Sequence, residues 1–391
     1  MSYFLQKLST TLFFILLSCI SKGQINFYGS FTPLCDSNEM DLSKLVKQRK
    51  LDSAINLINM AIKASPNKGV NYFNRAVINY YKKILSKNFY LKVDTLIYND
   101  CKRAMDYGYK KPEVYYLIFS QISQTDRVLG SGLPSYVDED GLSKELNYKD
   151  IKEYIDSAIE ISDHQIVKYF FARMIFFYKR LGEEQSIEQR QRSYGNDYQI
   201  QFPDDNRFKL DCRIVIEKSK DNYKKGAGYY FLSQISVLIN KDTIGAIQNL
   251  SDAIAADSGN IAYYSERATL KYNIGNYRGA ILDFNKYLAK ENRPEDLISR
   301  GNCFSLIENE KQAVLDYTSA INLFEKQLKE RKEKGEFNRV DYIKIHLGQG
   351  YYFRGISYLQ LKNKSKACLD FNQSLNFGYK MAQETITENC Q

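Results

Sequence analysis

Residues 263–284 read YYSERATLKYNIGNYRGAILDF, and two later segments follow the same plan. Residues 297–317 read LISRGNCFSLIENEKQAVLDY, and residues 351–371 read YYFRGISYLQLKNKSKACLDF. In each segment an Arg precedes a small residue, an Ala lies 12 positions after that small residue, and an aromatic residue follows the Ala by four. One structural unit therefore recurs along the chain.

The spacing predicts an antiparallel pair of helices in each unit. A small residue midway along one helix, such as Gly301, and an Ala near the start of the next, such as Ala313, let two backbones approach closely. The aromatic residue one turn after the Ala then fills the space between the helices. Because such a pair cannot bury its apolar face alone, neighbouring pairs must stack.

The distance between equivalent Ala residues gives the length of the unit. Ala246 and Ala280 are 34 residues apart, and Ala280 and Ala313 are 33 apart. The next step, to Ala367, is 54 residues, and its excess falls in the charged residues 324–342. We expect two lengthened helices there.

This pattern resembles the tetratricopeptide repeat, a 34-residue helix–turn–helix unit. The resemblance implies an all-α fold, a right-handed superhelical solenoid of antiparallel helix pairs, with about seven units over residues 42–382. The chain departs from the family pattern because it has no Trp and because the helix-ending Pro is clear only at Pro66. We expect regular repeats over residues 226–382 and a tail over 383–391.

Residues 42–225 match the pattern less well. Ala54, Ala61 and Pro66 are typical of a second helix, residues 71–76 of the first helix of the next unit, and residues 169–173 of another degenerate unit. Gly- and Pro-containing segments interrupt the helical periodicity at residues 130–141 and 193–205. We therefore predict degenerate repeats with inserted loops over residues 42–225.

A charged pair recurs with the repeats. Arg267, Arg300 and Arg354 are each followed 16 residues later by an Asp, at Asp283, Asp316 and Asp370. The constant offset predicts an ion pair between the two helices of one unit. We expect it to be partly exposed and to contribute about 0.2–1 kcal/mol each.

The amino terminus has the features of an export signal. A basic start at Lys7 precedes an apolar run over residues 8–18, which is too short to span a bilayer. Cleavage after Gly23 would leave Gln24 first, followed by an extended segment over residues 24–41. The alternative is a lipoprotein signal in which Cys19 is acylated. Both predict an exported protein, periplasmic or extracellular, and the second adds a lipid anchor in the outer membrane.

Export changes how the cysteines are interpreted. Six cysteines remain after Cys19, and an oxidising compartment permits disulfides between them. Cys101, Cys303 and Cys368 fall inside helical patterns, where we expect buried thiols. A disulfide that involves Cys35 or Cys390, near the ends of the mature chain, stays open.

The composition favours a binding protein over an enzyme. The chain has 391 residues, 44% of them hydrophobic, and a net charge of +9. It contains two His residues, and the sequence has no zinc-protease, nucleophile-elbow, phosphate-loop or dinucleotide-binding motif. We therefore predict no catalytic residues, no metal site and no cofactor. The alternatives are single-stranded nucleic-acid or polyanion binding on a basic aromatic groove and, less favoured, an uncharacterised hydrolase.

The resemblance also implies where a partner would bind. In the tetratricopeptide family the first helices line a concave groove that binds a partner protein or peptide, and we expect no nucleic acid there. Position by position, the groove would be lined by Phe73, Tyr116, Phe231, Thr269, Tyr272, Ile298, Asn302, Tyr352 and Ile356. The alternative is that the rings among them pack against neighbouring helices.

Overall fold

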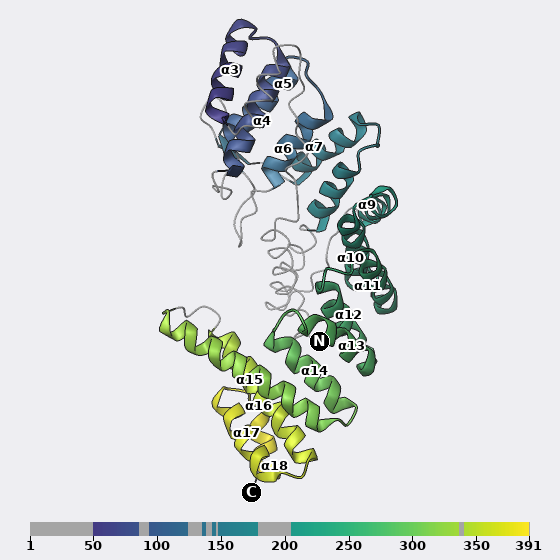
Figure 1. Ribbon diagram of the computed structural model, residues 1–391, viewed down its shortest axis with the longest axis vertical. Helices are drawn as coiled ribbons and strands as arrows, with labels where there is room; N and C mark the ends of the chain where they lie inside the picture. Colours follow the sequence, from purple (N-terminus) through teal and green to yellow (C-terminus); the bar gives the residue numbers. More distant parts are fainter. Residues whose placement is uncertain are drawn as a thin grey trace. The chain divides into compact units, whose positions relative to one another are not determined.

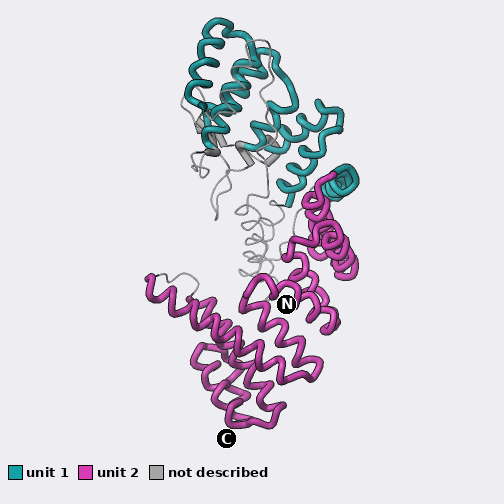
Figure 2. Tube along the Cα trace, viewed as in Figure 1, with its two compact units in different colours: residues 1–219 teal, residues 220–391 magenta. Residues whose placement is uncertain are grey.

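A computed structural model describes residues 50–85, 94–123, 135–137, 143–145, 148–178, 205–335 and 340–390. The predicted export signal, Cys19, Cys35 and the segment 24–41 lie outside these residues, as do most of the two predicted insertions. The chain divides into two compact units, residues 1–219 and 220–391 (Figure 2).

The first unit is built from helices that follow one another in the order of the sequence (Figure 1). They are α3 (Leu51–Ala64), α4 (Gly69–Leu85), α5 (Thr95–Asp106), α6 (Pro112–Ser123), α7 (Tyr148–Ile161), a helix described over residues 167–178, and α9 (Asp205–Lys218). One small departure from the all-α prediction occurs between α6 and α7. There β1 (Ser135–Val137), within the segment 130–141 predicted as a loop, pairs antiparallel with β2 (Ser143–Glu145), which follows that segment.

The second unit is helical throughout its described residues. Its helices are α10 (Asn222–Leu238), α11 (Thr243–Ala256), α12 (Ala262–Asn273), α13 (Tyr277–Leu288), α14 (Pro294–Leu306), α15 (Glu310–Glu333), α16 (Val340–Gln360), α17 (Lys364–Asn376) and α18 (Met381–Asn389). The predicted lengthening is confirmed, since α15 and α16 have 24 and 21 residues. None of the described helices is both long and apolar enough to cross a membrane.

The helices of each pair are named by their order in the chain. The first helices are α4, α6, 167–178, α10, α12, α14 and α16. The second helices are α5, α7, α9, α11, α13, α15 and α17. Within each unit consecutive helices contact each other. The predicted contact between a small residue and a ring is confirmed. A Cβ atom at Gly301 would lie 2.6 Å from Cε1 of Tyr317, and one at Gly355 would lie 2.6 Å from Cε1 of Phe371.

The turn from a first to a second helix has a constant design in the second unit. The residue two positions before the second helix has a positive φ, and the next residue caps that helix by accepting a hydrogen bond from a backbone N–H. The residues with positive φ are Lys241, Gly275, Glu308 and Lys362, and the caps are Asp242, Asn276, Asn309 and Asn363. This turn reverses the chain and sets each pair antiparallel.

The cysteines are partly as predicted. Cys101 and Cys303 are buried free thiols, as is Cys212. The prediction for Cys368 is wrong, because it forms a disulfide with Cys390, 22 residues later. Cys368 lies on α17 and Cys390 directly follows α18. The helical pattern of α17 alone does not reveal this tertiary contact. The disulfide fastens the last helix to the last pair.

Candidate partner-binding surface

The predicted ion pairs form in all three regular repeats. Nε and Nη2 of each Arg donate to the two carboxylate oxygens of the Asp 16 residues later. The shortest distances are 2.6 Å for Arg267–Asp283, 2.7 Å for Arg300–Asp316 and 2.8 Å for Arg354–Asp370. The expected partial exposure holds only for the Arg side chains, because each Asp is buried between the two helices of its pair.

Two further pairs with the same geometry occur in the first unit. Arg75 donates through Nε and Nη2 to Asp100, and Arg173 donates in the same way to Asp211. These partners are 25 and 38 residues apart, so the offset of 16 does not find them. The chemistry of the pair is retained where the connection between the helices is longer.

Each of these five Arg residues also reaches the preceding second-type helix. Its Nη1 atom donates to a side-chain oxygen there at 2.6–3.1 Å, and α3 provides that helix for Arg75. The acceptors are Asn59, Asp156, Ser251, Asn285 and Thr318. One guanidinium thus joins three helices and fixes the stacking of one pair on the next.

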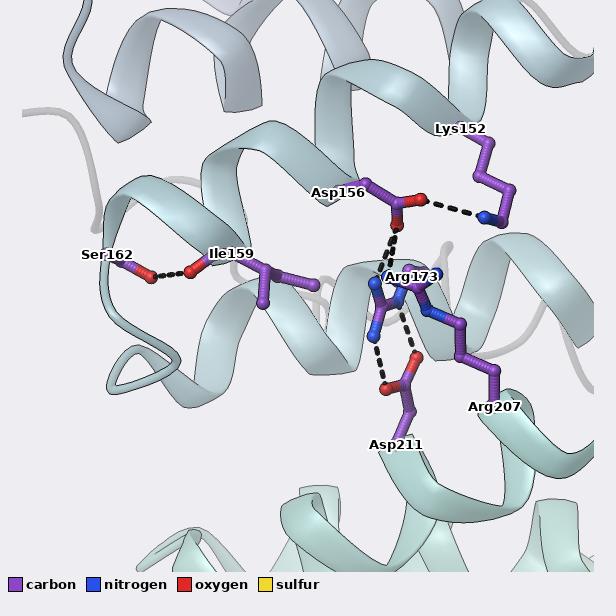
Figure 3. A network of polar contacts seen from close by, with 7 residues as sticks. All are labelled: Lys152, Asp156, Ile159, Ser162, Arg173, Arg207 and Asp211. Atoms are coloured by element: carbon purple, nitrogen blue, oxygen red, sulfur yellow. Dashed lines mark hydrogen bonds and ion pairs between the residues drawn. The ribbon is translucent and has the colours of Figure 1, made fainter.

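Arg173 shows this network most fully (Figure 3). Besides Asp211, it contacts Asp156 at 2.6 Å, and Asp156 also accepts from Lys152 at 2.8 Å and lies 3.3 Å from Arg207. Burial alone would raise the pKa of Asp156, but the hydrogen bonds from Lys152 and Arg173 outweigh it and lower that pKa. Asp156 is therefore held ionised.

The pair α10–α11 has neutral side chains at the positions of the ions. Ser233 and Asn249, which are 16 residues apart, occupy the positions of the Arg and the Asp. Asn249 donates to Oγ of Ser236 on α10 at 3.3 Å. This pair of helices therefore packs without the buried ion pair.

Four of the predicted groove residues are not available to a partner. Phe73, Tyr116, Phe231 and Ile298 are buried. The ring of Phe73 lies 5.5 Å from that of Tyr109, and the ring of Tyr116 lies 5.0 Å from that of Tyr169. The rings of Phe73 and Tyr116 thus lie against neighbouring segments of the chain, as the alternative interpretation of the groove positions expected.

The remaining five predicted groove residues are partly exposed. The ring of Tyr272 lies 5.7 Å from that of Tyr277 and is tilted against it, and Tyr352 packs against Phe371 and Tyr379. The other three, Thr269, Asn302 and Ile356, each follow the small residue of their first helix.

Thr269, Asn302 and Ile356 are called the first-helix row. The helices that carry the row contact one another in order, α12 with α14 and α14 with α16. Its side chains are a hydroxyl, an amide and an aliphatic group, without a charge. Thr269 donates to the carbonyl of Ser265 and Oδ1 of Asn302 accepts from Tyr317, so Thr269 can still accept and Asn302 can still donate a hydrogen bond.

Comparison with known proteins gives similarities in fold. No family model matches the chain, and no curated protein matches it. Among solved structures, a tetratricopeptide repeat protein from Parabacteroides merdae is 14% identical, with 82% of this chain and 99% of that one covered and a TM-score of 0.39. YrrB, described as a tetratricopeptide repeat protein with an unusual peptide-binding site, is 16% identical over 45% and 97% of the chains, with a TM-score of 0.29. The human IFIT1 dimer with PPP-AAAA is 13% identical over 92% and 76%, with a TM-score of 0.34.

The internal geometry characterises the architecture directly. Each pair in the second unit has its first helix packed on its second, and the pairs stack in the order of the sequence. Glycine faces a ring where Gly301 meets Tyr317 and Gly355 meets Phe371, and equivalent Ala residues recur at 33 and 34 residues. The described residues of the second unit therefore form an α-helical solenoid whose helix pairs resemble the tetratricopeptide repeat.

Proposed function

We propose that this chain is a non-catalytic scaffold of the cell envelope that binds a partner protein or a peptide segment. The observation that carries the proposal is the first-helix row, in which Thr269, Asn302 and Ile356 are partly exposed at equivalent positions of three stacked pairs. A continuous face of helices is a common surface for a peptide or an amphipathic helix.

The chemistry of the row favours a polypeptide over a polyanion. Nucleic-acid binding depends on Lys and Arg that neutralise phosphates. Arg267, Arg300 and Arg354, which lie beside the row on the same helices, are each bonded to a buried Asp. A partner would therefore meet neutral hydrogen-bonding groups and methyl groups.

The proposed location rests on two features. The sequence begins with the pattern of an export signal, and Cys368 and Cys390 form a disulfide. Disulfides persist in oxidising compartments such as the periplasm. The mass of the mature amino terminus would distinguish acylated Cys19 from Gln24, and a chain that keeps Met1 and stays in the cytoplasm would contradict the location.

The binding role is tested by cross-linking in the native cells. Thr269→Arg and Ile356→Arg place a charged side chain in the row, and Ser365→Arg, on an exposed site of α17, is the matched control. We expect a protein cross-linked to the wild-type chain and to the control to be lost from both row variants. A partner that is cross-linked equally well to the wild-type chain and to both row variants would contradict the proposal. Salt-sensitive retention on heparin with co-purified RNA would contradict it as well.

A further inference from the structure

The second unit has a cavity away from the first-helix row. It has a volume of about 640 Å³ and lies between the second helices α13 and α15, and residues of α14 also line it. Figure 1 shows these three helices in their order along the chain. This volume is within the range of sites that hold ligands. Neither the predicted groove nor the proposed function uses it.

The floor of the cavity is polar and electrically balanced. Arg300 of α14 donates to both oxygens of Asp316 on α15 at 2.7 Å. Its Nη1 atom donates to Oδ1 of Asn285 on α13 at 2.8 Å. With its oxygen engaged by Arg300, Asn285 presents amide N–H groups to a ligand. The remaining amides of the cavity are Asn292 and Asn322.

The two helices beside the cavity carry both aliphatic and polar side chains, and some of the aliphatic ones lie outside its lining. On α15, Leu315, Ser319 and Leu323 follow at intervals of four residues and share one side of the helix. On α13, Asn285 lies between Leu282 and Leu288 at intervals of three.

Leu282 and Leu315 lie outside the lining of the cavity, one helical turn from Asn285 and Ser319, and face solvent. Leu282 is 67% exposed and Leu315 is 59% exposed, and Leu288 and Leu323, which line the cavity, are partly buried. Aliphatic surface therefore extends from the cavity along both helices.

The distance between Leu315 and Leu323 on α15 fits an extended polypeptide. Eight residues of helix rise about 12 Å, so this distance separates Leu315 from Leu323 along the axis. Four residues of an extended peptide span about 13 Å. Two aliphatic side chains four positions apart in a peptide can therefore contact the two leucines. The backbone amides between them then lie beside Ser319 and the Asn side chains, which can both donate and accept.

We propose that the cavity between α13 and α15 binds an extended, uncharged peptide segment with aliphatic side chains four residues apart. The charge balance of Arg300 and Asp316 gives no preference for an acidic or a basic ligand. The inference goes beyond the proposed function, because it adds a second surface of different geometry to the scaffold.

The test uses the full chain and a displayed library of random peptides of about ten residues. Ser319→Trp and Ala289→Trp fill the cavity from opposite walls, and both positions are exposed. Gln373→Trp, at the position of α17 equivalent to Ser319, is the matched control. Circular dichroism and the melting temperature establish that each variant is folded.

We expect enriched peptides with two aliphatic residues four apart and no net charge. Their affinity should fall at least tenfold in both cavity variants and stay unchanged in Gln373→Trp. Peptides that lose binding in Thr269→Arg but not in Ser319→Trp would overturn the cavity site and leave the proposed first-helix surface intact. A library without enriched peptides, or a cavity that binds glycans from an array instead, would also overturn the inference.

Discussion

Arg354 on α16 and Asp370 on α17 are joined by two parallel hydrogen bonds of 2.8 Å, although Asp370 is almost fully buried. Arg354→Met would leave this carboxylate buried without a counter-charge, which costs about 3 kcal/mol or more. We expect a loss of that size in the free energy of unfolding, measured with urea at pH 7. Lys344→Met removes an ion pair with Asp341 that is exposed, and should change stability by less than about 0.5 kcal/mol.

A double substitution supplies a second test of this pair. Arg354→Gln with Asp370→Asn removes both charges at once, so the double variant should be more stable than Arg354→Met, which leaves the carboxylate unpaired. Equal stability of the two variants would mean that the buried charge is not the source of the loss.

The close packing of Gly355 against Phe371 makes a second prediction. A Cβ atom at Gly355 would lie 2.6 Å from Cε1 and 2.9 Å from Cδ1 of the ring, so the helices must separate. Gly355→Ala should lower the free energy of unfolding by about 1–3 kcal/mol, even though Ala is the better helix former. Gly259→Ala, where a Cβ atom meets only Asp257 at 3.6 Å, should be nearly neutral. Adding Phe371→Leu to Gly355→Ala should restore part of the loss if steric conflict is its cause.

The turn before α15 carries a strained residue that glycine would relieve. Glu308 has a φ of 62°, a left-handed conformation that costs a non-glycine residue about 1 kcal/mol. Gly275 holds the equivalent position before α13 with a φ of 79°. We therefore expect Glu308→Gly to raise the melting temperature and Gly275→Ala to lower it, both measured by calorimetry. A lower melting temperature in Glu308→Gly would show that its side chain contributes more than the strain costs.

The sequence was sufficient to predict the regular repeats because their contacts are local. Arg267 and Asp283 meet across one turn, and the spacing of Gly301, Ala313 and Tyr317 specifies one helix pair completely. The same Arg–Asp contact in the first unit could not be found by spacing, since Arg173 and Asp211 are separated by a longer connection. Sequence spacing identifies contacts between helices only where the connections have constant length.

The predicted groove was less accurate for a different physical reason. A first helix is covered on two sides, by its own partner and by the next pair, and both sides require apolar residues. The sequence pattern does not distinguish a ring such as Phe73, which a neighbour covers, from one that faces solvent. The sequence does mark aliphatic surface on the second helices, because an exposed Leu directly precedes the paired Asp at Leu282, Leu315 and Leu369.

The disulfide between Cys368 and Cys390 predicts how firmly the last helix is held. It closes a loop of 22 residues, and a cross-link of this length stabilises by about 3 kcal/mol. Cys390→Ser should increase amide hydrogen exchange over residues 381–389 and leave residues 262–288 unchanged. Dithiothreitol should reproduce the effect in the wild-type chain and add nothing in the variant. If amide exchange in α18 is unchanged by Cys390→Ser and by dithiothreitol, packing alone holds this helix.

Asp156 makes the stability of the first unit depend on pH. Burial opposes its ionisation, but hydrogen bonds from Lys152 and Arg173 lower its pKa below the ordinary value of about 3.9. The stabilisation is therefore complete above that value and is lost as the pH falls through the lower pKa of the folded state. Asp156→Asn should be less stable than the wild type at pH 7, and the difference should shrink below about pH 3.5. Hydrogen exchange over residues 151–178 measures it, with Glu160→Gln, an exposed carboxylate of α7, as control. A difference that is the same at both pH values would assign the effect to packing instead of charge.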